Sequence, residues 1–290
     1  MIDARGQRRT YRLTLRGSEA VLGERTWVMG VLNVTPDSFS DGGLYLDPGA
    51  AIARGLALFE AGADVVDVGG ESTRPGGAAL DPETEIGRVV PVIDGLRRQA
   101  RGLVSVDTTK ARVAAAALDA GAEIVNDVSG LSYDPELASL VAKRGVPVVL
   151  MHLRGDFAAM HRDPVYSDVM AEVMAELRQA LARAEAAGVP RGQVILDPGL
   201  GFSKAATHSL EVIRRLPEMA ALDRPVLAGP SRKSFIGRVL DLPVGERLMG
   251  TAAAVAACVL GGAHIVRVHD VGEMVQVVQM CDAIRGERAA

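Results

Sequence analysis

The chain has 290 residues, of which 48% are hydrophobic, 23% charged and 3% aromatic. That length and apolar content allow one large buried core, and α/β barrels of this size fold as single domains. A formal net charge of −4 gives no general attraction to nucleic acid or to anionic membranes. Composition therefore excludes binding to either through overall charge, and we expect neither as a partner.

The two cysteines and the N-terminal segment bear on the compartment. Cys258 and Cys281 stand alone without CxxC spacing, so we expect structural thiols in a reducing environment. Residues 1–25 lack the apolar centre of a signal peptide. The longest run of small apolar residues, 251–260, is half the length that a membrane span requires. We therefore expect a soluble cytoplasmic protein.

The first predicted elements are a hairpin and a buried strand. Residues 10–25 alternate loosely around Gly17 and predict a β-hairpin that closes the N-terminal mouth of a barrel and carries no chemistry. Residues 27–34 form a short apolar run rich in β-branched side chains, which is typical of a strand buried on both faces. A polar, glycine-bearing loop follows it. A strand followed by such a loop is the basic unit of an α/β barrel.

Seven more runs of the same kind follow in chain order. They cover residues 64–70, 102–108, 123–130, 146–152, 194–201, 225–231 and 264–270, and helical patterns between them include 50–61, 84–99, 109–120 and 165–187. Glycine recurs between a helix and the next strand, where it supplies a left-handed residue that ends the helix: Gly62, Gly121, Gly145, Gly188 and Gly262. Eight such units predict a single-domain (β/α)8 TIM barrel over residues 1–290, with an open doubly wound sheet as the alternative.

Two chemical groups terminate the predicted strands, where barrels place their active sites. The first group offers buried amide and carboxylate oxygens, which suit a flat heterocycle with several N–H donors and a carbonyl: Asp107, Asn126 and Asp197. The second group is cationic and suits a multiply charged phosphate: Arg74, Lys233, Arg267 and His269.

Each of these residues also has a purely structural interpretation. Asp107, Asp127 and Asp270 could cap helices, and Asp67 could be a satisfied polar residue inside the barrel. The histidines outside the cationic group favour structural or solvated roles: His152, His161, His208 and His264. The structural interpretation weakens because polar groups end all eight strands.

Seven segments together resemble the signature blocks of one enzyme family. They are MGVLNVTPDSFSDGG (29–43), DVGGESTRPGG (67–77), SVDTTK (105–110), NDVSG (126–130), DPGLGFSK (197–204), GPSRKSFIG (229–237) and RVHDV (267–271). They are similar to bacterial dihydropteroate synthase, in the order of that family and across nearly the whole barrel. The resemblance implies a transferase of folate biosynthesis and a sulfonamide target. It would condense 6-hydroxymethyl-7,8-dihydropterin diphosphate with 4-aminobenzoate, using Mg²⁺ and usually acting as a homodimer.

The resemblance also implies residue roles. The pterin would be held by residues Asp107, Asn126, Asp197 and Lys233. The diphosphate would lie against Arg74, Arg267, His269 and Asn33, of which Asn33 also meets Mg²⁺. Thr73 would contact the pterin substrate, and aminobenzoate would bind beside Thr73, Pro75, Phe202 and Ser231, near Lys233. The catalytic set would be Asp107, Asp197, Lys233, Arg267 and His269.

Physical chemistry suggests an order for this reaction. Loss of diphosphate leaves positive charge on a carbon conjugated to the electron-rich pterin, which buried carboxylates stabilise, so we expect an SN1-like path. We also expect the loops at 35–46 and 71–80 to close over the site and exclude water. Ser203 and Ser209 depart from the usual family pattern, and the roles of His152 and Arg154 stay open.

Two other functions compete with this interpretation. A pterin-dependent methyltransferase barrel would share the pterin-holding residues but would not require the SRKSF and TRPGG segments. A non-catalytic paralogue would bind pterin or a partner protein, and the loss of a residue such as Asn33 or His269 would have favoured it. For the expected dimer, the small-residue helix at 247–260 is the candidate surface.

Overall fold

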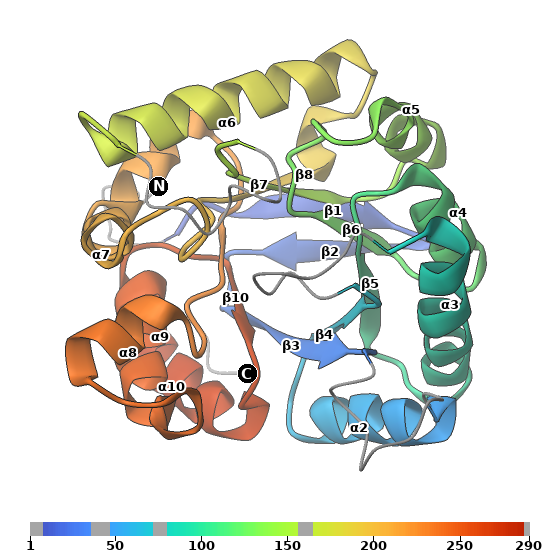
Figure 1. The fold of residues 1–290 in the computed structure, drawn as a ribbon, viewed down its shortest axis with the longest axis horizontal. Coiled ribbons are helices and arrows are strands. Elements are labelled where there is room, and N and C mark those ends of the chain that lie inside the picture. The colour runs from blue at the N-terminus through green and yellow to red at the C-terminus, as the bar shows by residue number, and fades with distance from the viewer. Residues whose placement is uncertain (1–7, 36–46, 72–79, 156–164, 287–290) are drawn as a thin grey trace.

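The computed structural model describes residues 8–35, 47–71, 80–155 and 165–286. Eight strands form one parallel sheet, and each consists mainly of buried residues (Figure 1). Their bounds are β3 (Trp27–Asn33), β4 (Val65–Gly69), β5 (Leu103–Asp107), β6 (Ile124–Asp127), β7 (Val148–Met151), β8 (Val194–Asp197), β9 (Leu227–Ala228) and β10 (Ile265–Val268). All eight lie inside the predicted apolar runs, so the pattern of doubly buried strands is confirmed.

The sheet curls into a barrel that is nearly closed. Its strand order is β8-β7-β6-β5-β4-β3-β10-β9, and every pairing is parallel. The two ends of this order meet at a single bridge between Leu196 and Val226, where Leu196 N donates to Pro225 O at 2.9 Å. The sequence prediction of a (β/α)8 barrel is therefore confirmed, and the open sheet is excluded.

Helices cover the outside of the barrel (Figure 1). They are α2 (Pro48–Glu60), α3 (Pro82–Gln99), α4 (Ala111–Asp119), α5 (Pro135–Arg144), α6 (Val169–Ala186), α7 (Ala206–Arg214), α8 (Ser234–Leu240), α9 (Leu248–Leu260) and α10 (Val271–Ile284), with 3-10 turns η1 (Arg191–Gln193), η2 (Leu216–Leu222) and η3 (Val244–Glu246). The five predicted helix-ending glycines all have positive φ, between +64° and +112°. None of the helices in the described ranges combines the length and the apolarity needed to cross a membrane.

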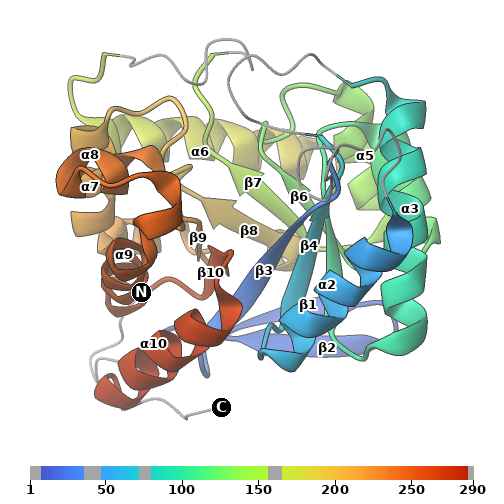
Figure 2. The same cartoon turned by 60° about the horizontal axis from the view of Figure 1, so that its bottom comes forward.

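The N-terminal hairpin closes the bottom of the barrel. Strands β1 (Tyr11–Leu15) and β2 (Ser18–Leu22) pair antiparallel around Gly17, as predicted. Figure 2 shows the hairpin lying across the lower end of the barrel strands. Its side chains Leu13 and Leu22 pack into one cluster with the inward-facing Val65 and Ile124. This inner cluster is separate from the larger layer between sheet and helices, so the barrel interior is filled from below and opens only above.

Several predicted boundaries differ from the structure, and two of the differences have a clear local cause. The segment 225–231 contributes only the two-residue strand β9, because Gly229 and Pro230 lead into a turn with Arg232 at φ +58°. Helix α6 begins at Val169 instead of 165, because the Asp168 side chain accepts hydrogen bonds from Met170 N and Ala171 N and so caps the helix. Neither change moves a predicted site residue away from the upper rim of the barrel.

Candidate active site

The centre of the upper rim is an arginine that joins two carboxylates. Arg267, on β10, donates from Nε to Asp67 Oδ2 and from Nη2 to Asp107 Oδ2, each at 2.7 Å. Asn126, at the end of β6, donates from Nδ2 to the same Asp67 oxygen at 2.8 Å. Four strands thereby meet in one hydrogen-bonded group. Asp107 and Asn126 lie within it as the sequence predicted, and Asp107 caps no helix.

Asp67 is the functional residue that sequence reasoning underrated. Its side chain is fully buried, and its strand places it inward, two residues above Val65 of the inner cluster. The sequence-based prediction leaves Asp67 out of the site and names only a structural possibility for it, a satisfied polar residue inside the barrel. In the structure it orients both Arg267 and Asn126, two predicted ligand-binding residues. A carboxylate in the middle of an otherwise apolar strand was the signal, because such a group requires a buried partner.

Burial and charge shift the ionisation of this group. Burial raises the pKa of Asp107 to about 7, and the nearby Asp67 carboxylate adds to the increase while Arg267 opposes it. Burial alone would lower the pKa of Arg267, but Asp67 and Asp107 outweigh it and raise the pKa. The arginine therefore stays charged, whereas Asp107 exchanges a proton near neutral pH.

Asp197 and Lys233 form the opposite side of the site. Asp197 ends β8, and its Oδ1 accepts a hydrogen bond from Gly199 N at 2.7 Å. Burial raises the pKa of Asp197, against the Gly199 hydrogen bond and the charge of Lys233. Burial lowers the pKa of Lys233 to about 7, helped by Arg267 and opposed by Asp197 and Asp107. The Lys233 ammonium lies 3.5 Å from the ring centroid of Phe202, so the predicted amine-site residues Phe202 and Lys233 are in contact.

Ser231 and His269 couple the turns after β9 and β10. Ser231 Oγ lies 3.0 Å from His269 Nδ1, and His269 N donates to the same hydroxyl at 3.2 Å. Burial lowers the pKa of His269 to about 4, and the charges of Arg267 and Arg232 add to this. The sequence counted His269 among the cations, but in the structure its imidazole is neutral, first because it is buried and then because Arg267 and Arg232 lie near it. Arg232 pairs with Asp270 through both carboxylate oxygens, so Asp270 orients a neighbouring turn and its side chain does not cap α10.

A space beside Asn33 suits a small hard cation. A Cβ placed on Gly69 would lie 3.7 Å from both Asn33 Oδ1 and Asp107 Oδ2, so the glycine keeps the gap between these oxygens open. No group of three or more His, Cys, Asp or Glu ligands occurs within the described ranges. Mg²⁺ needs no such group, because it commonly binds through one or two protein oxygens, several waters and substrate phosphates. The residues present therefore fit the predicted magnesium.

Other predicted residues fall into three sets. Thr73, Arg74 and Pro75, with most of the loops at 35–46 and 71–80, lie outside the described residues, as does His161. His208 and His264 have structural roles, since their Nδ1 atoms accept hydrogen bonds from Ala205 N and Val226 N. The cysteines are free and buried. The pattern of structural histidines and unbridged thiols is confirmed for these residues.

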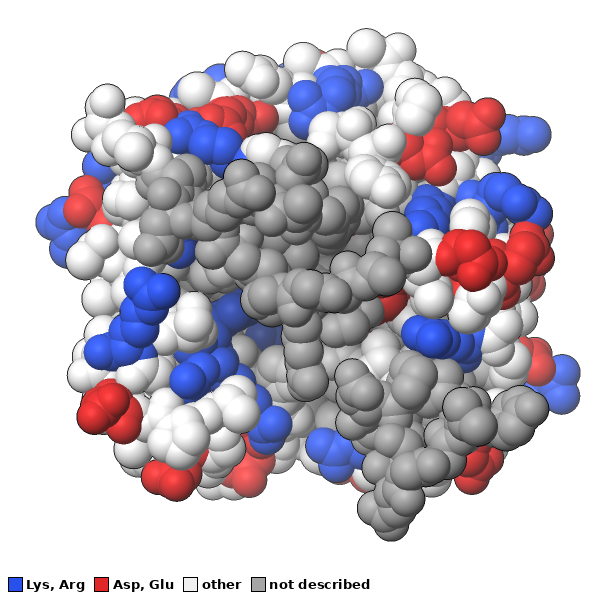
Figure 3. Space-filling view, viewed as in Figure 1, with Lys and Arg blue, Asp and Glu red and all other residues white. Residues whose placement is uncertain are grey.

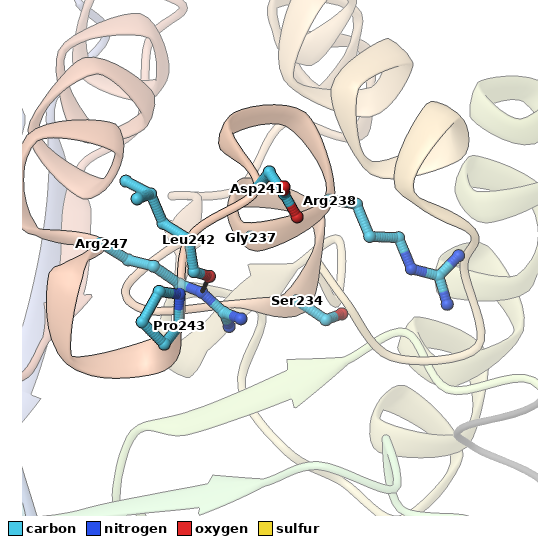
Figure 4. Close-up of a pocket in the computed structure, with 7 residues that line it drawn as sticks. All are labelled: Ser234, Gly237, Arg238, Asp241, Leu242, Pro243 and Arg247. Carbon is cyan, nitrogen blue, oxygen red and sulfur yellow. Dashed lines mark hydrogen bonds between the residues drawn. The ribbon is translucent and has the colours of Figure 1, made fainter.

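A separate hollow of about 430 Å³ lies beside α8 and contains none of the predicted site residues (Figure 4). Arg247 there donates from Nε to Leu242 O at 3.0 Å and from Nη1 to Arg232 O at 3.1 Å. Gly237 leaves room for that guanidinium, because an added Cβ would lie 2.2 Å from Nη2. Arg247 therefore stabilises the local backbone, and nothing in the hollow suggests that the active site lies there.

Figure 3 shows basic and acidic groups intermingled on the described part of the rim.

Comparison with known proteins agrees with this geometry. Residues 29–269 match the family described as pterin binding enzyme, which defines the chain as a pterin-binding barrel. The chain is 50% identical to dihydropteroate synthase of Mycobacterium leprae over 264 residues, which are 88% of this chain and 92% of that protein. The solved dihydropteroate synthase of Xanthomonas albilineans with 4-aminobenzoic acid has a TM-score of 0.89 at 43% identity, covering 96% of this chain and 99% of that one.

A second structure of the Xanthomonas albilineans enzyme, in complex with 7,8-dihydropteroate, has a TM-score of 0.85 at 40% identity and covers 94% of this chain and 98% of that one. The chain therefore belongs to the dihydropteroate synthase family of transferases.

Proposed function

We propose that this chain condenses 6-hydroxymethyl-7,8-dihydropterin diphosphate with 4-aminobenzoate, releasing diphosphate and forming 7,8-dihydropteroate for folate biosynthesis. The observation that carries the proposal is Arg267 held by the fully buried Asp67 and the partly buried Asp107, with Lys233 and His269 beside it, in a chain of this family. Relatives solved with 4-aminobenzoic acid and with 7,8-dihydropteroate support both the amine and the product.

The pterin would bind to the oxygen-rich side of the site. Asp107, Asn126 and Asp197 offer acceptors for the ring N–H groups, and Asn126 also offers a donor for the ring carbonyl. Ring N–H donors would favour the ionised form of each carboxylate and so oppose the effect of burial on its pKa. Binding would thus leave two negative charges beside the pterin.

The leaving diphosphate would lie on the cationic side. Arg267 supplies a fixed, permanently charged donor, and His269 becomes a cation when the anion raises its pKa. Arg74 belongs to the same proposal. Asn33 would hold Mg²⁺ in the gap beside Gly69, and the ion would supply further positive charge for the diphosphate.

The arylamine would enter on the side of Phe202, Ser231 and Lys233, with Thr73 and Pro75 completing the pocket. The Phe202 ring offers an apolar face for the benzene ring, and the Lys233 ammonium above it offers a charge for the carboxylate. Because the pKa of Lys233 lies near 7, a bound carboxylate would shift it toward the charged form.

Charge placement favours an SN1-like order. As the carbon–oxygen bond to diphosphate breaks, positive charge develops on the pterin next to Asp107 and Asp197, while negative charge collects beside Arg267. Preorganised contacts of this kind stabilise a transition state by roughly 3 to 4 kcal/mol each. The neutral amine then attacks the cation, and its nitrogen passes one proton to the released diphosphate or to solvent, so no side-chain nucleophile is required.

The first experiment follows diphosphate release by the purified protein with the pterin substrate and Mg²⁺, with and without 4-aminobenzoate. Dihydropteroate equal in amount to diphosphate supports the synthase, and release without amine supports early bond cleavage. Pterin binding with neither product would make the non-catalytic paralogue the better interpretation. Diphosphate that leaves the pterin only after amine binds would contradict the SN1-like order.

The proposal includes a homodimer formed through α9 in the cytoplasm, where the buried cysteines would stay reduced. Large apolar side chains are exposed around this helix, with Met249 77%, Val244 59% and Val239 58% exposed. Light scattering on M249E tests the surface, because a charge there should give a monomer, and an unchanged mass would contradict it.

A further inference from the structure

A line of polar side chains runs from helix α6 to the turn after β8, outside the group described above. Lys204 Nζ donates to His152 Nδ1 at 2.8 Å, and His152 Nε2 lies 2.9 Å from Glu176 Oε2. Lys204 and His152 are buried, whereas the Glu176 side chain is 30% exposed. The proposed reaction uses none of the three. These contacts give His152 a role that the sequence left open.

The protons in this line have one consistent arrangement. The ionised Glu176 carboxylate can only accept, so His152 Nε2 carries the hydrogen that binds it, and Nδ1 of the neutral ring accepts from Lys204. Burial lowers the pKa of His152 to about 4, so the ring is neutral. Burial raises the pKa of Glu176, but hydrogen bonds from His152 and Arg154 outweigh it and bring the pKa to about 2. A fixed anion therefore orients the ring that accepts from Lys204.

Lys204 also binds the backbone of the turn that contains Phe202. Its Nζ donates to Gly199 O at 3.1 Å and to Phe202 O at 3.2 Å. Together with the His152 bond, these contacts match the three donors of the charged form. Burial lowers the pKa of Lys204 to about 7, and the charges of Asp197 and Glu176 oppose this decrease. The turn includes left-handed residues at Gly199, Gly201 and Ser203, and Phe202 N donates within it to Gly199 O at 3.1 Å. Lys204 adds a donor from outside the turn to the carbonyl oxygens of Gly199 and Phe202.

This turn carries two parts of the active site. Gly199 N binds the Asp197 carboxylate at 2.7 Å, and the Phe202 ring lies 3.5 Å from the Lys233 ammonium. The charge of Lys204 also acts directly on Asp197 and favours its ionised form. Movement of the turn would thus disturb the predicted pterin carboxylate and the predicted wall of the amine pocket at once.

We propose that Lys204 is a positioning residue for the reaction, which holds the 199–202 turn in shape while His152 and Glu176 hold Lys204. The proposal rests on the proposed function for the identity of the ligands. Lys204 itself touches neither substrate, and it acts through Asp197 and Phe202.

A second tether attaches the same loop and lets it fold without Lys204. Ser203 Oγ donates to Arg154 O at 2.7 Å and accepts from Arg154 N at 3.2 Å, while Tyr166 donates its hydroxyl hydrogen to Ser203 O at 2.8 Å. Ser203 has φ +46°, which explains why the family often has glycine there. The serine departure therefore adds a link between the loops after β7 and β8.

The test compares three variants by pterin affinity, measured by titration without turnover, and by the KM for 4-aminobenzoate. K204M should raise both the pterin Kd and this KM about tenfold, as the loss of a charge-assisted hydrogen bond predicts. E176A should raise both by less. E172A is the matched control, because Glu172 is 33% exposed and binds Arg154 but not His152. The double variant K204M/E176A should equal K204M, because the proposal has Glu176 act through Lys204 and not through Arg154, which it also binds.

The proposal fails if K204M folds, keeps the pterin Kd and the KM for 4-aminobenzoate within about twofold of the parent, and loses only thermal stability. A change of about twofold is no larger than the deviation found between independent sites. It also fails if E172A weakens binding as much as E176A, because the effect would then belong to Arg154. If K204M does not fold, the E176A variant becomes the test, because Glu176 is partly exposed and its loss should be tolerated. A pterin Kd and a KM for 4-aminobenzoate equal to those of the parent would then overturn the proposal. A parent that binds pterin but makes no dihydropteroate would refute the proposed function, while the pterin Kd comparison would still test Lys204.

Discussion

Replacement of Asp67 by asparagine tests the centre of the site most directly. D67N keeps the shape of the side chain and one acceptor oxygen but removes the charge between Arg267 and Asn126. Arg267 retains Asp107 as a partner, so the guanidinium is not left buried and unpaired. The protein should therefore fold, and the change should appear mainly as lost orientation.

The size of the effect follows from the bonds that Asp67 makes. A hydrogen bond to a charged group contributes about 2 kcal/mol, so kcat/KM for the pterin substrate should fall by a factor of about 30. The ionisation of Asp107 should change as well. The Asp67 charge raises the pKa of Asp107, and its removal also frees Arg267 for Asp107, so both effects lower this pKa from about 7.

The assay is the pterin Kd measured between about pH 5 and pH 8, together with kcat/KM at neutral pH. Binding to the ionised carboxylate weakens as pH falls through the pKa of Asp107, so in D67N the weakening should begin at a lower pH than in the parent. D119N serves as the control, because Asp119 is 66% exposed and its ion pair with Arg144 joins the ends of α4 and α5 outside the site. A folded D67N with unchanged kcat/KM and an unchanged pH profile would refute the role given to Asp67.

Three further predictions concern the ligand site and the fold. 4-Aminobenzoate binding at about pH 7.5 should take up protons, because its carboxylate raises the pKa of Lys233 from near 7; calorimetry in two buffers of different ionisation enthalpy checks the sign, and proton release would contradict it. G69A should keep Tm within about 2 °C, because the added Cβ makes only ordinary contacts of 3.5 Å or more. The same Cβ fills the gap beside Asn33, so Mg²⁺-dependent diphosphate binding should weaken severalfold, and unchanged affinity would show that the gap holds no ligand. R8M should destabilise the protein by about 3 kcal/mol in denaturant unfolding, because Asp282 is buried and loses its ion pair, while kcat of the folded enzyme stays the same.

The fold could be predicted from local pattern because its strands are buried on both faces. Each apolar run contains one strand, and the glycines after the helices have the left-handed φ that ends a helix. Strand β9 shows the limit of this method. The run at 225–231 is as apolar as the others at its start, yet its strand has only two residues, because Gly229 and Pro230 lead into a turn, and the barrel closes there through a single bridge to β8.

The site could be predicted only as a set of residue types. Asp107, Asn126, Asp197, Lys233 and Arg267 end strands in the order that the sequence indicates, but no local feature says which of them touch. The bond from Arg267 to Asp67 joins residues 200 positions apart. For the same reason the orienting role of Asp67 and the line from Glu176 to Lys204 could not be read from spacing.

The sequence by itself determined the eight strand-helix units, their order and the polar groups at their ends, because these depend on periodicity and on residues near one another in the chain. Tertiary structure decided which charges meet and what state they adopt. Closure of the barrel brings the ends of all strands to one rim, where burial removes water from each charged group. His269 is neutral and Lys233 titrates near pH 7 for that reason, since a pKa depends on neighbours in space.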